Sequence, residues 1–179
     1  MASKSYHILT KDYNKGRRDF IGIDLSSKSW FQTDMRGVIL IGADLSKSNL
    51  HRINLTSARM SGISLTKASL TKANLTFSCL IDANLQGSNL CSANMHGAIL
   101  CQANLSEANL KQVNLREANL LNAKLFKADL SGANLLGADL KGVDLREACL
   151  KDAKVDHKEL GKAILGKTVM PDGSVSNIA

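Results

Sequence analysis

An apolar side chain occupies every fifth position from residue 20 to residue 150. From Leu25 onward this residue, here called the centre, is Leu in all cases but four, which are Trp30, Met35, Met60 and Met95. Two residues before most centres lies a small or β-branched residue, mostly Ala, and the residue directly before the centre is usually Asn or Asp. An amphipathic helix repeats its apolar positions about every 3.6 residues and a half-buried strand about every 2, so this pattern predicts neither.

A solenoid accommodates a five-residue repeat, because each repeat is too short to bury its apolar face alone and must stack on its neighbours. If each pentapeptide forms one side of a coil and turns a corner, four sides close a coil of about twenty residues. Leu and Ala then point to the axis. Residues one coil apart would stack at the spacing of hydrogen-bonded strands, about 4.8 Å.

The repeated unit resembles that of the pentapeptide repeat family, through motifs such as Ala73-Asn74-Leu75, Ala83-Asn84-Leu85 and Ala133-Asn134-Leu135. The resemblance implies an all-β solenoid, a right-handed quadrilateral β-helix, with about seven coils over residues 17–155. It also implies helical caps, with an N-terminal cap over 1–16 and a C-terminal helix and hairpin tail over 156–179.

The first coil departs from the pattern, because Lys28 and Thr33 occupy positions where the small inward residue belongs and Trp30 is a centre. An ammonium group is costly to bury without a partner. We therefore expect the Ser26–Thr33 segment to be distorted. The alternative is that Lys28 directs its ammonium outward.

Both ends carry signals for capping elements. A helix is predicted over Ser5–Asn14, with Ile8, Leu9 and Tyr13 near one face, and Gly16 should end it. After residue 154 the repeat decays, and Asp156 is expected to cap a helix that carries Leu160, Ala163 and Ile164 on one side. The Pro171-Asp172-Gly173 turn signal between two β-prone triplets predicts a hairpin over residues 168–175.

Composition narrows the function classes. We find no Ser-His-Asp set, carboxylate pair, phosphate loop or dinucleotide motif, so we expect no enzyme activity, no cofactor and no small-molecule substrate. No apolar run approaches the ~20 residues that span a bilayer. The four Cys residues form no disulfide framework, which favours the cytoplasm. Cys91, His96 and Cys101 would lie on three successive sides of a coil, so we predict no metal site there.

Outward positions on one side of the coil are mostly apolar, which predicts a partner or self-association surface, a homodimer being one form of it. We call the following residues the apolar strip: Ile39, Ile41, Cys79, Ile81, Ile99, Cys101 and Leu121. The alternatives are that β-branched residues simply suit this side, or that a terminal segment covers it. Arg59 and Ser61 interrupt the strip.

Basic residues gather at a corner of the N-terminal half, within a chain of net charge +7. We call the following residues the basic cluster: Lys47, His51, Arg52, Lys67 and Lys72. The cluster suits an acidic partner, with an ordinary solvated surface as the alternative. No aromatic residue accompanies these basic residues, so base stacking is unsupported and nucleic acid is not the expected partner.

The function we expect is that of a non-catalytic protein-binding scaffold or regulator. Some cyanobacterial members of the family act in heterocyst differentiation, so the resemblance extends to developmental regulation. The alternative is a nucleic-acid-directed factor that binds DNA through the basic cluster or acts on a topoisomerase. Some pentapeptide repeat proteins mimic DNA and inhibit gyrase, but that role needs an acidic surface and this chain has the opposite sign.

Overall fold

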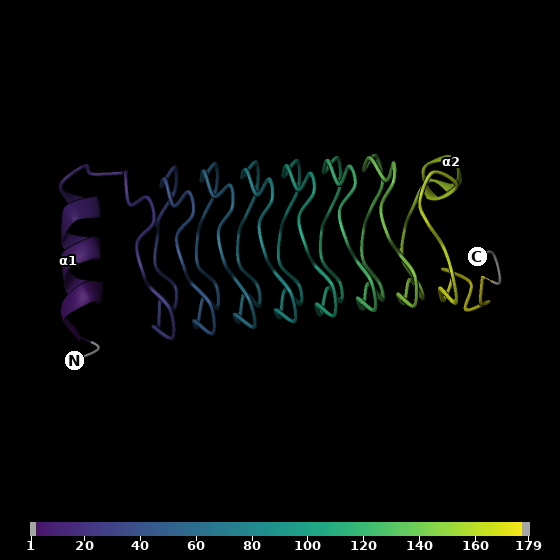
Figure 1. Ribbon diagram of the computed structural model, residues 1–179, viewed down its shortest axis with the longest axis horizontal. Helices are drawn as coiled ribbons and strands as arrows, with labels where there is room; N and C mark the ends of the chain where they lie inside the picture. Colours follow the sequence, from purple (N-terminus) through teal and green to yellow (C-terminus); the bar gives the residue numbers. More distant parts are fainter. Residues whose placement is uncertain (1–2, 177–179) are drawn as a thin grey trace.

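The structure, a computed structural model, describes the backbone of residues 3–176 and the side chains of residues 9–176. The chain forms a rod of stacked coils between two helices, α1 (Ser3–Asn14) and α2 (His157–Leu160) (Figure 1). Parallel bridges join residues twenty apart, such as Asn54 to Asn74 and Asn84 to Asn104. The predicted twenty-residue coil is therefore confirmed.

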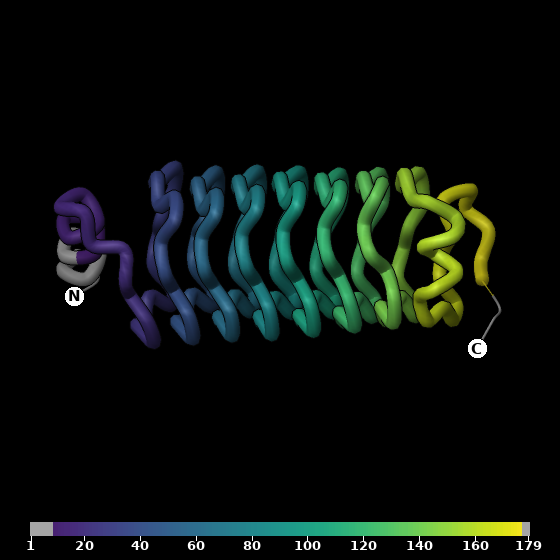
Figure 2. Tube along the Cα trace, turned by 90° about the horizontal axis from the view of Figure 1, so that it is seen from above, coloured from purple at the N-terminus to yellow at the C-terminus, as the bar shows by residue number. Residues whose placement is uncertain are grey.

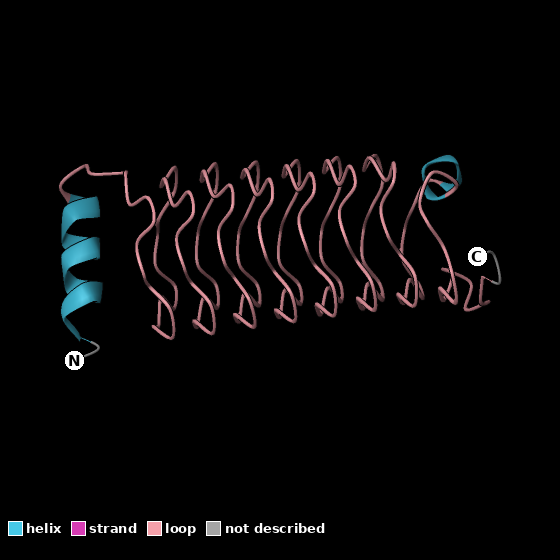
Figure 3. Cartoon of the chain, viewed as in Figure 1, coloured by secondary structure: helices cyan, strands magenta, loops and turns pink. Residues whose placement is uncertain are grey.

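The coils contain isolated bridges instead of extended strands, and Figure 3 draws them as loops. Each side of a coil, here called a wall, contributes one bridging residue, the one directly before the centre. The chain turns a corner every five residues, so one residue per wall has ladder geometry before the direction changes. Hydrogen bonding between coils is nevertheless regular, as where Leu85 N donates to Asn104 O at 2.7 Å.

The corner explains the polar half of the repeat. The second residue after each centre has a positive φ, between 53° and 60° where it is not Gly. A bond such as Ala43 N to Leu40 O, 3.1 Å, closes the turn. The Asn or Asp before the centre accepts a hydrogen bond from the N–H two residues on, as Asn104 Oδ1 does from Ser106 N at 3.1 Å. These residues recur because their side chains satisfy turn backbone locally.

The core is one continuous column of side chains along the axis. Every centre from Phe20 to Leu150 is at most 4% exposed, and Ala residues two positions earlier are buried beside them. This is the arrangement that the five-residue pattern predicts.

The expected distortion of the first coil was wrong. Ser29 bridges Asn49 in the regular register, Trp30 is fully buried as a centre, and Thr33 also lies in a regular coil. Lys28 is half-buried, and its Nζ donates to the backbone carbonyl of Ser26 at 3.4 Å. Because a local carbonyl accepts from the ammonium, the lysine does not force the backbone out of phase.

At the N-terminus, α1 begins two residues before the predicted start, and Ile8 lies outside the described side chains. Gly16 (φ +96°) follows it, where Gly16 N donates to Tyr13 O and Arg17 N to Asp12 O, the two bonds of a Schellman ending. Figure 2 shows the helix at the end of the rod. Leu9 is buried, so α1 contributes to the core.

At the C-terminus, the ladder runs past the predicted end at residue 155. Asp144 bridges Ile164 and Cys149 bridges Val169, so the five-residue phase continues. The predicted helix is shorter than expected, since α2 holds four residues and leaves Ile164 50% exposed. Leu160 remains a buried centre within it.

Asp156 does not cap α2 with its side chain. Its Oδ2 instead accepts from Gly137 N at 2.9 Å. Elsewhere in the rod, a backbone carbonyl of the next coil accepts the equivalent bond. The hairpin prediction is confirmed, because Val169 pairs with Val175 in antiparallel fashion around the turn.

Candidate interaction surfaces

The apolar strip lies on one wall, which we call the apolar wall. Bridges connect Ile39 to Arg59, Arg59 to Cys79 and Cys79 to Ile99, so these side chains stack along the rod axis. Ile99 is 39% exposed, and the other strip residues are half-buried. Arg59 is exposed within the strip, and Ser61 Oγ lies 3.4 Å from Cys79 Sγ.

The apolar wall begins one coil earlier than predicted. Ile21 lies one coil before Ile41 and is 58% exposed. The twenty-residue spacing from Ile41 points to this residue from the sequence alone.

No described terminal segment covers the apolar wall. Figures 1 and 2, turned by 90° from each other, both place α1 at one end of the rod and α2 with the hairpin at the other. The alternative of a covering segment therefore fails for residues 3–176.

The thiols are free, and burial raises the pKa of the Cys101 thiol above its ordinary value. Cys91, His96 and Cys101 are not brought together. Within the described part of the chain, no three His, Cys, Asp or Glu residues are grouped to hold a metal ion.

The basic cluster occupies two adjacent corners and the wall between them. Lys47 N donates to Thr66 O and Arg52 N to Thr71 O, so Lys47 stacks below Lys67 and Arg52 below Lys72. All four side chains are exposed.

One statement about the basic cluster was wrong, namely that no aromatic residue accompanies it. Phe31 lies one coil below His51, and the two rings stack with centroids 5.6 Å apart and an interplanar angle of 6°. The residues are far apart in the linear sequence, and only the coil period shows them to be neighbours.

Ionic pairing differs along the rod. Towards the C-terminus, Lys111 pairs with Asp129 at 3.1 Å and Lys127 with Glu147 at 3.5 Å. The hydrogen bond from Arg146 also holds the pKa of Asp144 below its ordinary value of 3.8. Between residues 45 and 81 the sequence has five Lys or Arg residues and no acidic one. That segment supplies most of the net charge.

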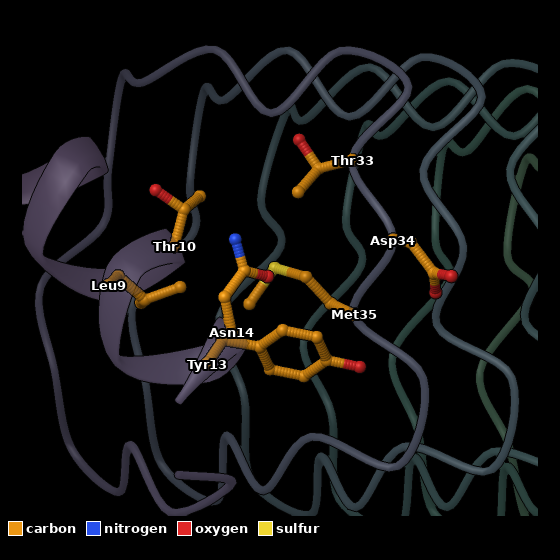
Figure 4. A pocket seen from close by; sticks show the side chains of 7 residues that line it. All are labelled: Leu9, Thr10, Tyr13, Asn14, Thr33, Asp34 and Met35. Carbon is orange, nitrogen blue, oxygen red and sulfur yellow. The ribbon is translucent and has the colours of Figure 1, made fainter. Parts of the chain in front are cut away.

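A recess of about 360 Å³ lies between α1 and the first coils (Figure 4). Tyr13 and Asn14 line it from the helix, and Thr33 and Met35 from the coil. Tyr13 donates its hydroxyl to Arg36 O at 2.8 Å, which ties the helix to the rod. The recess contains neither a nucleophile paired with a base nor a pair of carboxylates among its described lining residues.

A family model described as pentapeptide repeats matches eight copies of the repeat within residues 19–157. The chain belongs to the pentapeptide repeat family. Proteins of this family fold as right-handed quadrilateral β-helices, and they are in general non-enzymatic structural or binding proteins.

Several solved pentapeptide repeat structures are similar to this chain. One from the Arabidopsis thaliana thylakoid lumen is 30% identical over 49% of this chain and 65% of its own, less than two thirds of its length, with a TM-score of 0.42. HetL is involved in heterocyst differentiation regulation in the cyanobacterium Nostoc sp. strain PCC 7120. It is 29% identical over 94% of this chain and 98% of its own, with a TM-score of 0.35.

A second Nostoc PCC 7120 pentapeptide repeat protein, alr5209, is 25% identical over 89% of this chain and 93% of its own, with a TM-score of 0.42. Among curated proteins, none matches the chain. Over the described residues, no helix is long and apolar enough to cross a membrane.

Proposed function

We propose that this pentapeptide repeat protein is a non-catalytic binding rod that engages another protein through the apolar wall. The observation that carries the proposal is the stacked row of Ile, Cys and Leu side chains with no described segment over it. Contiguous apolar surface on a rod costs solubility unless a partner covers it.

The partner should present an apolar face with a carboxylate opposite Arg59. Arg59 is exposed in the middle of the strip, and the described structure gives it no ion pair. A charge flanked by apolar side chains fixes the register of an interface and rejects partners that lack the opposite charge.

The proposal includes a regulatory role in the cytoplasm, with α1 and the C-terminal hairpin as caps of the rod. Four free thiols support a reducing compartment. Capping is supported by the position of α1 at an end where coil edges would otherwise be open. Heterocyst differentiation, in which HetL is involved, is one setting for such a regulator.

The test compares two double variants that each introduce two lysines. Ile81→Lys with Ile99→Lys places charge in the centre of the apolar wall. Phe126→Lys with Leu136→Lys removes outward apolar side chains from two other walls, where Phe126 is half-buried and Leu136 is 36% exposed. We expect the first pair to abolish association with the partner and the second to preserve it.

Affinity capture at physiological salt, with quantitative mass spectrometry, would measure partner binding, and light scattering would measure self-association. A captured protein that is lost only with the Ile81/Ile99 variant supports the proposal. Unchanged capture and unchanged mass in that variant would remove it. A mass that falls only in that variant would identify the occupant as a second copy of this chain.

A further inference from the structure

The basic cluster forms a second surface, opposite the apolar wall. Its wall has Leu50 and Leu70 as centres, two pentapeptides along the coil from Leu40 and Met60. Lys47 and Lys67 stack on one edge of this wall, and Arg52 and Lys72 stack on the other. We call this surface, with the outward residues between the two edges, the cationic wall. Because it faces away from the apolar wall, the inference does not rest on the proposed function.

The four cations have no anionic partner in the described structure. No ion pair there involves Lys47, Arg52, Lys67 or Lys72. Further along the rod, ion pairs do form on the same wall and on the edge that Lys47 occupies. Lys111 lies on this wall and Lys127 on its Lys47 edge, and both are paired. Two rows of exposed, unpaired cations attract a ligand with several negative charges.

The surface between the rows is polar and suits hydrogen bonding. Asn49, His51, Ser69 and Thr71 point outward there. The Lys67 stem extends along the axis, because its Cγ is 3.6 Å from where a Cβ on Gly87 would be.

The aromatic pair decides the class of anion. Phe31 is 49% exposed and stacks in parallel on His51, at the N-terminal end of the cationic wall. An acidic peptide would use the cations but not the flat rings. Single-stranded nucleic acid uses both, because phosphates contact Lys and Arg while unpaired bases stack on aromatic side chains.

We propose that the cationic wall binds single-stranded nucleic acid, with phosphates on the two rows of cations and a base on the Phe31–His51 pair. The coils repeat at about 4.8 Å, so the surface spans a few nucleotides. A duplex would keep its bases away from the rings, so single strands should bind more tightly than duplexes of the same length.

The experiment measures fluorescence anisotropy of a labelled twelve-nucleotide oligothymidylate between 50 and 200 mM salt, with the whole chain. Four phosphate contacts predict a slope of log affinity against log salt of about −2.8. Arg52→Gln with Lys67→Gln should reduce the slope to about −1.4. Phe31→Leu should weaken binding by at least about fivefold and leave the slope unchanged.

The matched control is Lys111→Gln with Lys127→Gln, which removes the same charge from the same wall and edge but from paired sites. It should leave affinity nearly unchanged. Far-ultraviolet circular dichroism would show that each variant keeps the wild-type fold.

Three results would overturn the proposal. The first is an absence of binding at 50 mM salt, and the second is equal loss in the matched control. The third is tighter binding of a labelled twelve-residue oligoglutamate with no effect of Phe31→Leu on either ligand, which would assign the wall to acidic peptides.

Discussion

The apolar wall and the cationic wall share one backbone and one core but differ in the chemistry of most of their outward side chains. Behind them, Leu100 and Leu70 are both fully buried. The corner after the apolar wall holds Gly42 at φ +64°, and the equivalent corner after the cationic wall holds Arg52 at φ +57°. The fold constrains the inward positions and the sign of φ at the corners, but it does not constrain the identity of the outward side chains. Binding chemistry can therefore vary from wall to wall without a change of architecture.

Truncation of a buried Leu in the shared core should have the largest effect on the stability of the rod. Leu70→Ala and Leu100→Ala should each destabilise the rod by about 2–5 kcal/mol, since both leave a cavity in a close-packed axis. Urea unfolding followed by far-ultraviolet circular dichroism would measure this. Leu70→Met is the control, because Met60 and Met95 already occupy centres, and should cost less than about 1.5 kcal/mol.

If the two walls share one core, both alanine variants should unfold in a single transition. A variant that loses one wall while the other resists urea would show that the walls are stabilised separately.

Exchanging the corner residues should have a smaller effect that separates stability from binding. Arg52→Gly should stabilise the rod by up to about 1 kcal/mol, because a non-Gly residue is strained at positive φ. The same change should weaken oligonucleotide binding through loss of a cation. Thermal unfolding and anisotropy would measure the two effects.

Gly42→Lys is the reciprocal change on the other corner. Nothing lies within 4 Å of the added Cβ, so only backbone strain should matter. It should lower stability by about 1 kcal/mol and leave oligonucleotide affinity close to that of the wild type. Unchanged stability in both corner variants would contradict the role of φ.

Thiol reactivity should show the smallest difference between the walls. Cys101 lies on the apolar wall and Cys91 on the wall of His51, one or two coils away from the residues of the basic cluster. Burial raises the pKa of the Cys101 thiol, so less thiolate is available at pH 8, and iodoacetamide should label Cys101 more slowly in the rod than in an unfolded peptide that contains it. Its labelling should rise as pH increases beyond 9.0, the ordinary value.

Peptide mass spectrometry would quantify both sites. Association through the apolar wall should slow Cys101 labelling further and spare Cys91. Equal labelling rates for Cys101 in the rod and in the unfolded peptide would argue against the raised pKa.

The repeat made most of the fold predictable. The five-residue spacing predicts which residues are the centres. Four walls of five residues predict a coil of twenty, and the bridge from Asn54 to Asn74 confirms this length. The predicted distortion around Lys28 was wrong. Whether the Ser26 carbonyl can accept from the Lys28 ammonium depends on the direction of the backbone, which the residue spacing does not specify. Leu160 kept its phase inside α2, where the loss of the Ala-Asn-Leu motif had indicated an end to the repeat.

The candidate surfaces were less predictable than the core. The twenty-residue period sorts outward residues by wall, so the sequence alone predicts the apolar strip and the basic cluster. Whether a terminal segment covered the strip depended on where α1 lies. The stacking of Phe31 on His51 depended on ring orientation, which sequence spacing alone does not give.

The stretch from residue 83 to residue 106 contains no Asp, Glu, Lys or Arg, and its coil bonds only to its two neighbours. A duplicate of residues 85–104 inserted there would keep the Leu phase and add no ionic group. The molecule would grow by one increment of about 4.8 Å. The length of the rod can therefore change in steps of one coil. Duplication or loss of twenty codons in the gene would lengthen or shorten the rod and leave its binding surfaces unchanged.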